Sequence, residues 1–228
     1  MHPNHYTLAL LKHLLDKARH TLFPEDRLNE MHTKYEVFLQ NHQATQQEIE
    51  ELIGKFGKEI WPYHEALEEL YKRHGQKKED AMVKEKLAPE LRKKYEKFLE
   101  DGGSLSDFRH GVETEMLFTS EEKFEIGKAT VDANHTVLQE IANACNIEHK
   151  PECEEVIQDH KEKLARIEKK LDVLRAMAMR SEKWRPEIEE RVHTFETAFG
   201  YLSKTFHEQD IDGTIDYYQG VIEEDATL

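Results

Sequence analysis

Apolar residues recur every three or four positions along most of the chain, which is the spacing of one face of an α-helix. The first run ends before Pro24, because the residue that precedes a proline disfavours helical backbone. Its members are Leu8, Leu11, Leu15, Ala18 and Leu22. Continued along the chain, the pattern predicts helices near residues 5–22, 25–42, 45–74, 77–100, 119–146, 152–180, 186–208 and 214–224.

Two short motifs predict where helices begin. Thr45 with Glu48, and Thr119 with Glu122, have the spacing of a capping box, in which each side chain bonds the free backbone amide of the other residue. Prolines predict interruptions, and Pro62 falls inside the third pattern, where we expect a kink or a break. Residues 101–104, Asp-Gly-Gly-Ser, form the strongest predicted boundary, since the glycines end one helix and the serine can begin another.

Three consecutive helices in the second half carry narrow apolar stripes and are joined by short turns. The predicted face of residues 119–146 consists of Phe124, Val131, Leu138, Ile141 and Cys145. The next two helices are predicted to bury Leu164, Ile167, Leu171, Leu174, Val192, Phe195, Phe199 and Leu202. The sequence therefore predicts an all-α protein, an antiparallel helical bundle or set of long hairpins with up-down topology and coiled-coil-like seams. Its predicted parts are residues 1–101 and 104–228, either as two regions or as one continuous domain.

The composition favours helices and disfavours two classes of partner, nucleic acid and anionic lipid. Charged residues make up 35% of the chain, above the roughly 25% that is usual, and 10 Gly and 6 Pro are too few for an all-β protein. No glycine-rich phosphate loop occurs. The formal net charge of −15 disfavours nucleic acid and anionic lipid, which bind mainly through Lys and Arg. We expect no nucleic-acid partner and no membrane association.

The expected state of the two cysteines, free or bonded, depends on the cellular compartment. Cys145 and Cys153 flank the turn around Pro151, so a hairpin could bring them together in a disulfide. No signal peptide is evident, and the longest purely apolar run near the N-terminus, Leu8 to Leu11, is far too short to span a membrane. The sequence therefore predicts a cytoplasmic protein with free thiols, because the cytoplasm is reducing.

Histidine is abundant, with 14 residues, and two of the histidines fall on predicted stripes. His135 and His160 are equidistant from the turn near residues 146–151, and His207 reaches the same level across the next turn. Histidine and carboxylate from neighbouring helices form the metal sites of ferritin-like and hemerythrin-like bundles. The alternative prediction is therefore a site for a transition metal such as iron or zinc, formed by His135, His160, His207, Glu140 and Asp159.

Other motifs weaken this alternative. Only one Glu-x-x-His occurs, Glu190 to His193, whereas a di-iron site normally uses two. The stretch from Glu208 to Asp216 resembles part of an EF-hand loop, but Gln219 stands where the closing glutamate should be, so a helix break at Gly213 is predicted instead of a calcium site. No G-x-S-x-G or catalytic cysteine pattern is present. The main prediction is a non-enzymatic helical protein, without a cofactor, that acts through a partner protein or through self-association as a homo-oligomer.

Overall fold

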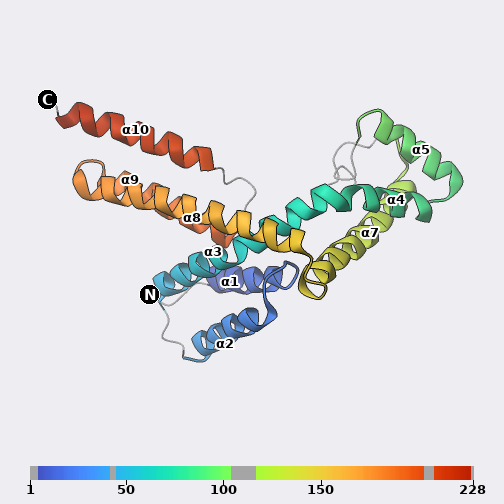
Figure 1. Ribbon diagram of the computed structural model, residues 1–228, viewed down its shortest axis with the longest axis horizontal. Helices are drawn as coiled ribbons and strands as arrows, with labels where there is room; N and C mark the ends of the chain where they lie inside the picture. Colours follow the sequence, from blue (N-terminus) through green and yellow to red (C-terminus); the bar gives the residue numbers. More distant parts are fainter. Residues whose placement is uncertain (1–4, 42–44, 104–116, 203–207, 227–228) are drawn as a thin grey trace. The chain divides into compact units, whose positions relative to one another are not determined.

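The computed structural model describes residues 5–41, 45–103, 117–202 and 208–226, and all regular structure in these ranges is helical (Figure 1). The predicted all-α fold is confirmed. The helices are α1 (His5–Ala18), α2 (Glu25–Asn41), α3 (Gln46–Leu70), the π-helical segment η1 (Tyr71–Gly75), α4 (Gln76–Lys86), α5 (Pro89–Glu100), α7 (Ser120–Asn146), α8 (Pro151–Arg180), α9 (Arg185–Gly200) and α10 (Glu208–Ala226). Within these ranges, no helix is both long and apolar enough to cross a lipid bilayer.

Both predicted capping boxes are present. The Thr45 amide donates to the Glu48 carboxylate at 2.7 Å and the Glu48 amide donates to the Thr45 hydroxyl at 3.2 Å. Thr119 and Glu122 repeat this geometry at 2.7 and 3.2 Å. Each pair satisfies two backbone amides that the first helical turn would otherwise leave free. The helix starts were therefore encoded locally.

The structure has no break at Pro62 and none at Gly213, where the sequence predicted one. Helix α3 continues through Pro62 without a break, and the irregular turn comes later, at η1. Gly213 and Thr214 lie inside α10, where the Thr214 hydroxyl donates to the Asp210 carbonyl at 2.7 Å. The stretch that resembles an EF-hand loop is thus one continuous helix and has no loop with which to surround a calcium ion.

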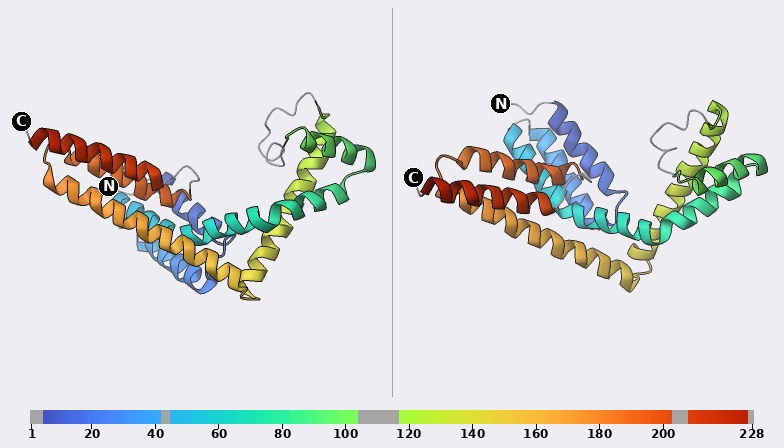
Figure 2. Two further views of the ribbon diagram at one scale, coloured as in Figure 1. Left: turned by 45° about the horizontal axis from the view of Figure 1, so that its top comes forward. Right: turned by 90° about the horizontal axis from the view of Figure 1, so that it is seen from above.

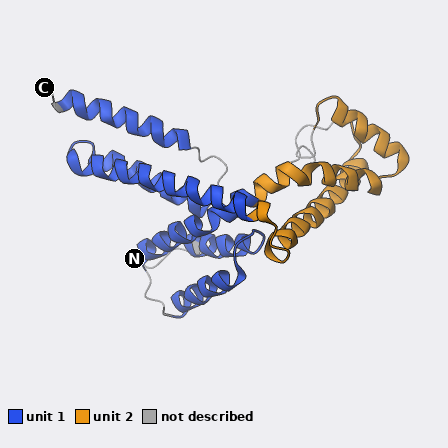
Figure 3. Cartoon of the chain, viewed as in Figure 1, with its two compact units in different colours: residues 1–66, 154–228 blue, residues 67–153 orange. Residues whose placement is uncertain are grey.

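The chain divides into two compact units (Figure 3). Unit 1 comprises residues 1–66 and 154–228, and unit 2 comprises residues 67–153. The predicted boundary at residues 101–104 lies inside unit 2. Whether residues 1–101 and 104–228 fold separately stays a prediction.

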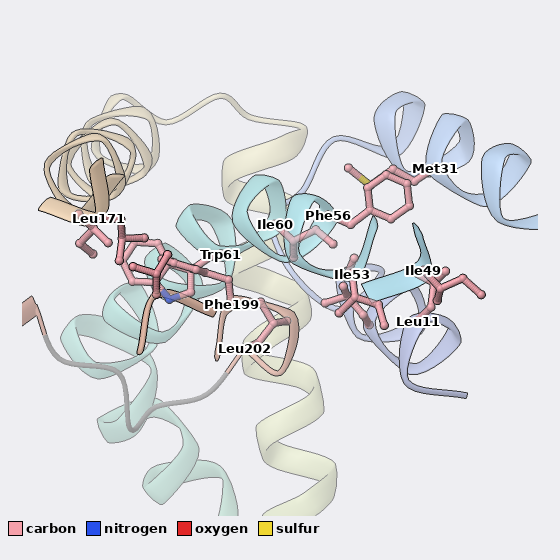
Figure 4. Packing of buried hydrophobic residues seen from close by; sticks show 14 of the residues in the cluster. Leu11, Met31, Ile49, Ile53, Phe56, Ile60, Trp61, Leu171, Phe199 and Leu202 are labelled. Atoms are coloured by element: carbon pink, nitrogen blue, oxygen red, sulfur yellow. The ribbon is translucent and has the colours of Figure 1, made fainter. Parts of the chain in front are cut away.

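Unit 1 is a helical bundle around one apolar core, part of which is shown in Figure 4. Helices α8, α9 and α10 run side by side with alternating direction, as the views in Figures 1 and 2 show. The predicted buried positions of α8 and α9 are confirmed, with Leu164 and Phe195 half-buried at the rim. The fully enclosed members include Leu11, Leu15, Met31, Ile49, Phe56, Ile60, Ile167, Leu171, Leu174 and Phe199.

Glycines allow α3 and α9 to approach closely within unit 1. A Cβ atom on Gly57 would lie 2.5 Å from the Gly200 amide nitrogen and from the Phe199 carbonyl, so only glycine fits there. A Cβ on Gly200 would in turn lie 2.3 Å from the Ile53 side chain. The two helix backbones are therefore in direct contact, and the rings of Phe199 and Trp61 pack edge to face beside them at 5.7 Å.

Unit 2 has its own core, formed where α4 and α5 pack on α7. Its buried members are Val83, Leu87, Leu91, Tyr95, Phe118, Ile126, Ala129 and Ala133. Three ion pairs border this contact and link α7 to the preceding helices: Lys78 with Glu140, Lys86 with Asp132 and Lys94 with Glu122. Pairs this exposed contribute little stability, so the apolar contact dominates.

The glycine contact generates a prediction about stability. We expect Gly57→Ala to lower the free energy of unfolding by about 1–3 kcal/mol, because the added methyl group overpacks a backbone contact. The matched control is Gly54→Ala, where the nearest atom to the new Cβ is the Glu196 carbonyl oxygen at an ordinary 3.9 Å. It is expected to raise stability by up to about 0.8 kcal/mol through helix propensity. Urea denaturation measures both, and equal shifts would contradict the close contact.

Candidate functional site

The π-helical segment η1 follows α3 directly and is followed directly by α4, and we call this contiguous run of helical residues the rod. A π turn holds an extra residue compared with an α turn, and such segments occur often at functional sites. Gly75 ends η1 where the rod meets α7, and a Cβ there would lie 2.8 Å from the Val137 side chain and 2.6 Å from the Tyr71 ring. The missing side chain therefore lets η1 and α7 approach closely within unit 2.

A buried polar cluster lies beside η1. Glu79 on α4 is completely buried, and its carboxylate accepts hydrogen bonds from the Tyr71 hydroxyl and, at 3.1 Å, from the Asn134 amide. Burial of an ionisable group is costly unless hydrogen bonds compensate, so these donors stabilise the carboxylate in place. Because Glu79 is shut off from solvent, the cluster fixes η1 and α4 against α7 and offers no surface to a ligand.

A pocket of about 310 Å³ opens next to this cluster in unit 2. The His74 ring and the Glu152 carboxylate are 2.8 Å apart at its rim, and Arg73 approaches the same carboxylate at 3.4 Å. These contacts, His74 first, hold the pKa of Glu152 below its ordinary value. The apolar floor consists of Leu70, Val137, Ile141 and Ala144. Since the rim charges pair with one another, the pocket has no excess charge of either sign to select a ligand.

The hairpin between α7 and α8 closes one side of this pocket with a disulfide. Cys145 and Cys153 are bonded, their Cα atoms are 5.3 Å apart, and both side chains are buried. The expectation of free thiols is therefore wrong. A spacing of eight residues across a tight turn permits the bond, whatever compartment the sequence suggests.

The predicted metal ligands are distributed over both units. His135 and Glu140 lie on α7 in unit 2, whereas Asp159 and His160 lie on α8 in unit 1. The Glu140 carboxylate pairs with Lys78, and the His160 ring packs edge to face on Trp61 at 6.0 Å between centroids. His207 lies outside the described residues. In the ranges that the structure covers, no three His, Cys, Asp or Glu side chains gather closely enough to hold a metal, and the metal site stays a prediction.

The expected burial of His135 is wrong, because α7 turns a different face inward. The side chains that it buries are Ile126, Ala129, Thr130, Ala133, Val137 and Cys145. Of the predicted face, Phe124 is 73% exposed and Val131 is 61% exposed. Alanines at positions 129 and 133 let α4 come close, which explains why the smaller residues face inward.

This outward face is the most distinctive surface of unit 2. Phe124, Val131 and Leu138 are spaced by seven residues and therefore lie nearly in line along α7, and we call them the α7 stripe. Leu138 is half-buried, and the other two are the large exposed members. At about 100° per residue, the stripe lies roughly opposite the buried face of the helix. The α7 stripe is thus an apolar helix face that the described residues of unit 2 leave largely exposed.

A second hollow, in unit 1, is polar. It has a volume of about 910 Å³ and lies between α3, α9 and Glu168 of α8, and its lining includes His193. Lys58 pairs there with Glu196 at 3.0 Å and approaches Glu168 at 3.8 Å, while Arg175 also pairs with Glu196. Lys58, Arg175 and Glu196 are thus paired with one another, and the predicted Glu190–His193 motif contributes only an exposed histidine to the wall.

The buried cluster generates a second prediction. Tyr71→Phe should lower the free energy of unfolding by about 1–3 kcal/mol, because it removes a donor from a fully buried carboxylate. Tyr217→Phe is the control, since this ring is 56% exposed and loss of its hydroxyl should change stability by less than about 0.5 kcal/mol. Thermal and urea unfolding measure both variants. Equal effects would mean that Tyr71 does not support Glu79.

The disulfide generates a third prediction. Alkylation of the unfolded, unreduced protein should modify no cysteine, and prior reduction should expose two reactive thiols. A Cys145→Ser, Cys153→Ser double variant should be less stable by about 2–3 kcal/mol, because the short loop regains entropy in the unfolded chain. Intact mass spectrometry counts the modified thiols. Two alkylated cysteines without reductant would contradict the bond.

Comparisons with known proteins were made at three levels. No protein-family model matches the chain, and no curated protein and no solved structure matches it either.

Proposed function

We propose that this protein is a non-enzymatic helical protein that acts through contact with another protein chain, either a partner or a second copy of itself. The contact surface in this proposal is the α7 stripe. The single observation that carries it is the exposure of Phe124 and Val131, at 73% and 61%, in line on the outer face of one helix.

An apolar helix face that is left in water costs free energy. Single exposed apolar residues are normal, and Val173 on α8 is one, 46% exposed, with Arg166 and Arg180 seven residues before and after it. Two large side chains one heptad apart form the kind of narrow seam through which helices pair. Burial of such a seam gains roughly 25 cal/mol for each Å² removed from water. A partner helix would supply that burial.

Charge narrows the class of partner. The net charge of −15 repels nucleic acid and anionic lipid surfaces, which favours a protein partner. We also propose a cytoplasmic location, although glutathione and thioredoxin reduce exposed disulfides in that compartment. Cys145 and Cys153 are only 7% and 5% exposed, so folding itself shields the bond from these reductants.

The test of this proposal compares association with stability. A photoreactive benzoylphenylalanine in place of Phe124 should form covalent adducts with a protein chain on illumination in an extract of the source cells. The same group in place of Val173 should form none, because that residue is isolated. The adducts should vanish when Val131 in the same chain is changed to Ser, since the stripe would then be interrupted.

The unfolding free energy of a Phe124→Ser variant can contradict the proposal. As an exposed side chain, Phe124 should tolerate replacement by Ser with a change in unfolding free energy within about 0.5 kcal/mol. A loss of about 3–5 kcal/mol, typical of a core phenylalanine, would show that the chain itself covers the stripe. An absence of adducts at position 124 would equally contradict the proposal.

A further inference from the structure

The α7 stripe can be assigned a specific occupant, and this step rests on the proposed function. We propose that the stripe binds a second copy of this chain, with the two α7 helices antiparallel and a twofold axis passing at Val131. The apolar side chains of α7 and the charged side chains beside them favour the same register.

The apolar part follows from the even spacing of the stripe. Phe124 precedes Val131 by seven residues and Leu138 follows it by seven. In an antiparallel pair centred on Val131, the two Val131 side chains therefore meet, and Phe124 of each copy lies against Leu138 of the other. Three apolar layers result, with the largest side chain always facing the half-buried leucine.

The charged part follows from one edge of the stripe. Glu125, Lys128, Asp132 and His135 are all exposed and border the stripe on the same side. In an antiparallel pair with a perpendicular twofold axis, the same edge of each helix faces its copy. Lys128 then lies within about 3 Å, measured along the helix axis, of Asp132 in the other copy, and Glu125 has the same offset from His135.

These charges are available for contacts between copies. In the part of the chain that the structure describes, Glu125, Lys128 and His135 take part in no ion pair, while Asp132 pairs with Lys86 at 3.3 Å. The twofold axis brings the two Asp132 carboxylates near each other. Each of them would then lie between its own Lys86 and the Lys128 of the other copy, so two cations offset each carboxylate.

A parallel pair does not match these charges. It would set this edge against the other edge of α7, which carries Gly127, Asn134 and Ile141 and offers Lys123 as its charged residue. Lys128 and His135 would then face no carboxylate. In the antiparallel register, therefore, the apolar layers are buried and Lys128 of each copy also lies near Asp132 of the other.

The net charge opposes this dimer, because each copy carries a formal charge of −15. At low ionic strength the copies repel each other as they approach, and salt screens this repulsion within about 8 Å at physiological concentration. Association should therefore strengthen as salt rises toward 0.15 M, in contrast to a contact governed by opposite net charges.

Cysteine scanning tests the register in the full chain with its disulfide intact. Two helix axes 8–10 Å apart bring the Cα atoms of Val131 and its copy within the reach of a disulfide. Val131→Cys should therefore form a disulfide-linked dimer with itself under mild oxidation. Phe124→Cys should not, because the two positions 124 lie about 21 Å apart along an antiparallel pair. In a parallel pair both variants would cross-link.

Charge reversal gives an independent measurement that does not use cysteine. Sedimentation equilibrium should show a dimer whose dissociation constant rises about tenfold in Lys128→Asp, because the change breaks two symmetry-related pairs. Lys123→Asp is the matched control, since it alters the net charge equally on the other edge. Its dissociation constant should stay within about twofold of the wild-type value.

The outcomes separate this inference from the proposed function. A chain that is monomeric up to about 1 mM at 0.15 M salt, with no Val131→Cys cross-link, overturns the second copy. Phe124 adducts that contain only a different protein overturn it as well, while the proposed function stands. Self-cross-linking of both Val131→Cys and Phe124→Cys refutes the antiparallel register.

Discussion

Close approach of helices at glycine positions shapes the packing of both units. In unit 1, Gly57 on α3 touches the backbone at the end of α9, and in unit 2, Gly75 at the end of η1 lets α7 come against the rod. Both glycines lie on the same continuous stretch of helix from α3 to α4. Helices packed this closely leave room only for small side chains between them, which is consistent with Ala129 and Ala133 on the buried face of α7. Large residues that find no room inside, such as Phe124, lie on the surface.

In unit 1, the spacing of apolar residues and one capping box predicted helices that the structure contains. Leu15 of α1 and Leu171 of α8 belong to predicted stripes with an uninterrupted spacing of three and four residues, and both side chains are buried. The capping box at Thr45 was equally readable, because its chemistry involves only four residues. In such elements, local propensity and tertiary packing agree, so the pattern of the sequence is sufficient.

Unit 2 departs from the pattern for a physical reason. Hydrophobicity favours Phe124 and Val131 over Ala129 and Ala133 as the buried face, yet close packing favours the small residues. Nothing in the sequence distinguishes Glu79 from the other charges of its segment, because its burial depends on donors from Tyr71 and from α7. The histidine prediction failed at His135 for the same reason as the stripe: the helix is rotated relative to the face that the apolar pattern indicated.

The π turn also changes the repeat that the chain follows. From Tyr71 onward the inward positions come every four residues, at Tyr71, Gly75, Glu79, Val83 and Leu87, and not at the average spacing of 3.6. A wider turn is how a helix accommodates an added residue without breaking. Removal of a single residue within η1 would therefore rotate every later side chain of α4 by about 100° about the helix axis. The Glu79 carboxylate would then point toward water. The length of this segment, more than its composition, keeps the Glu79 carboxylate directed toward its donors on η1 and α7.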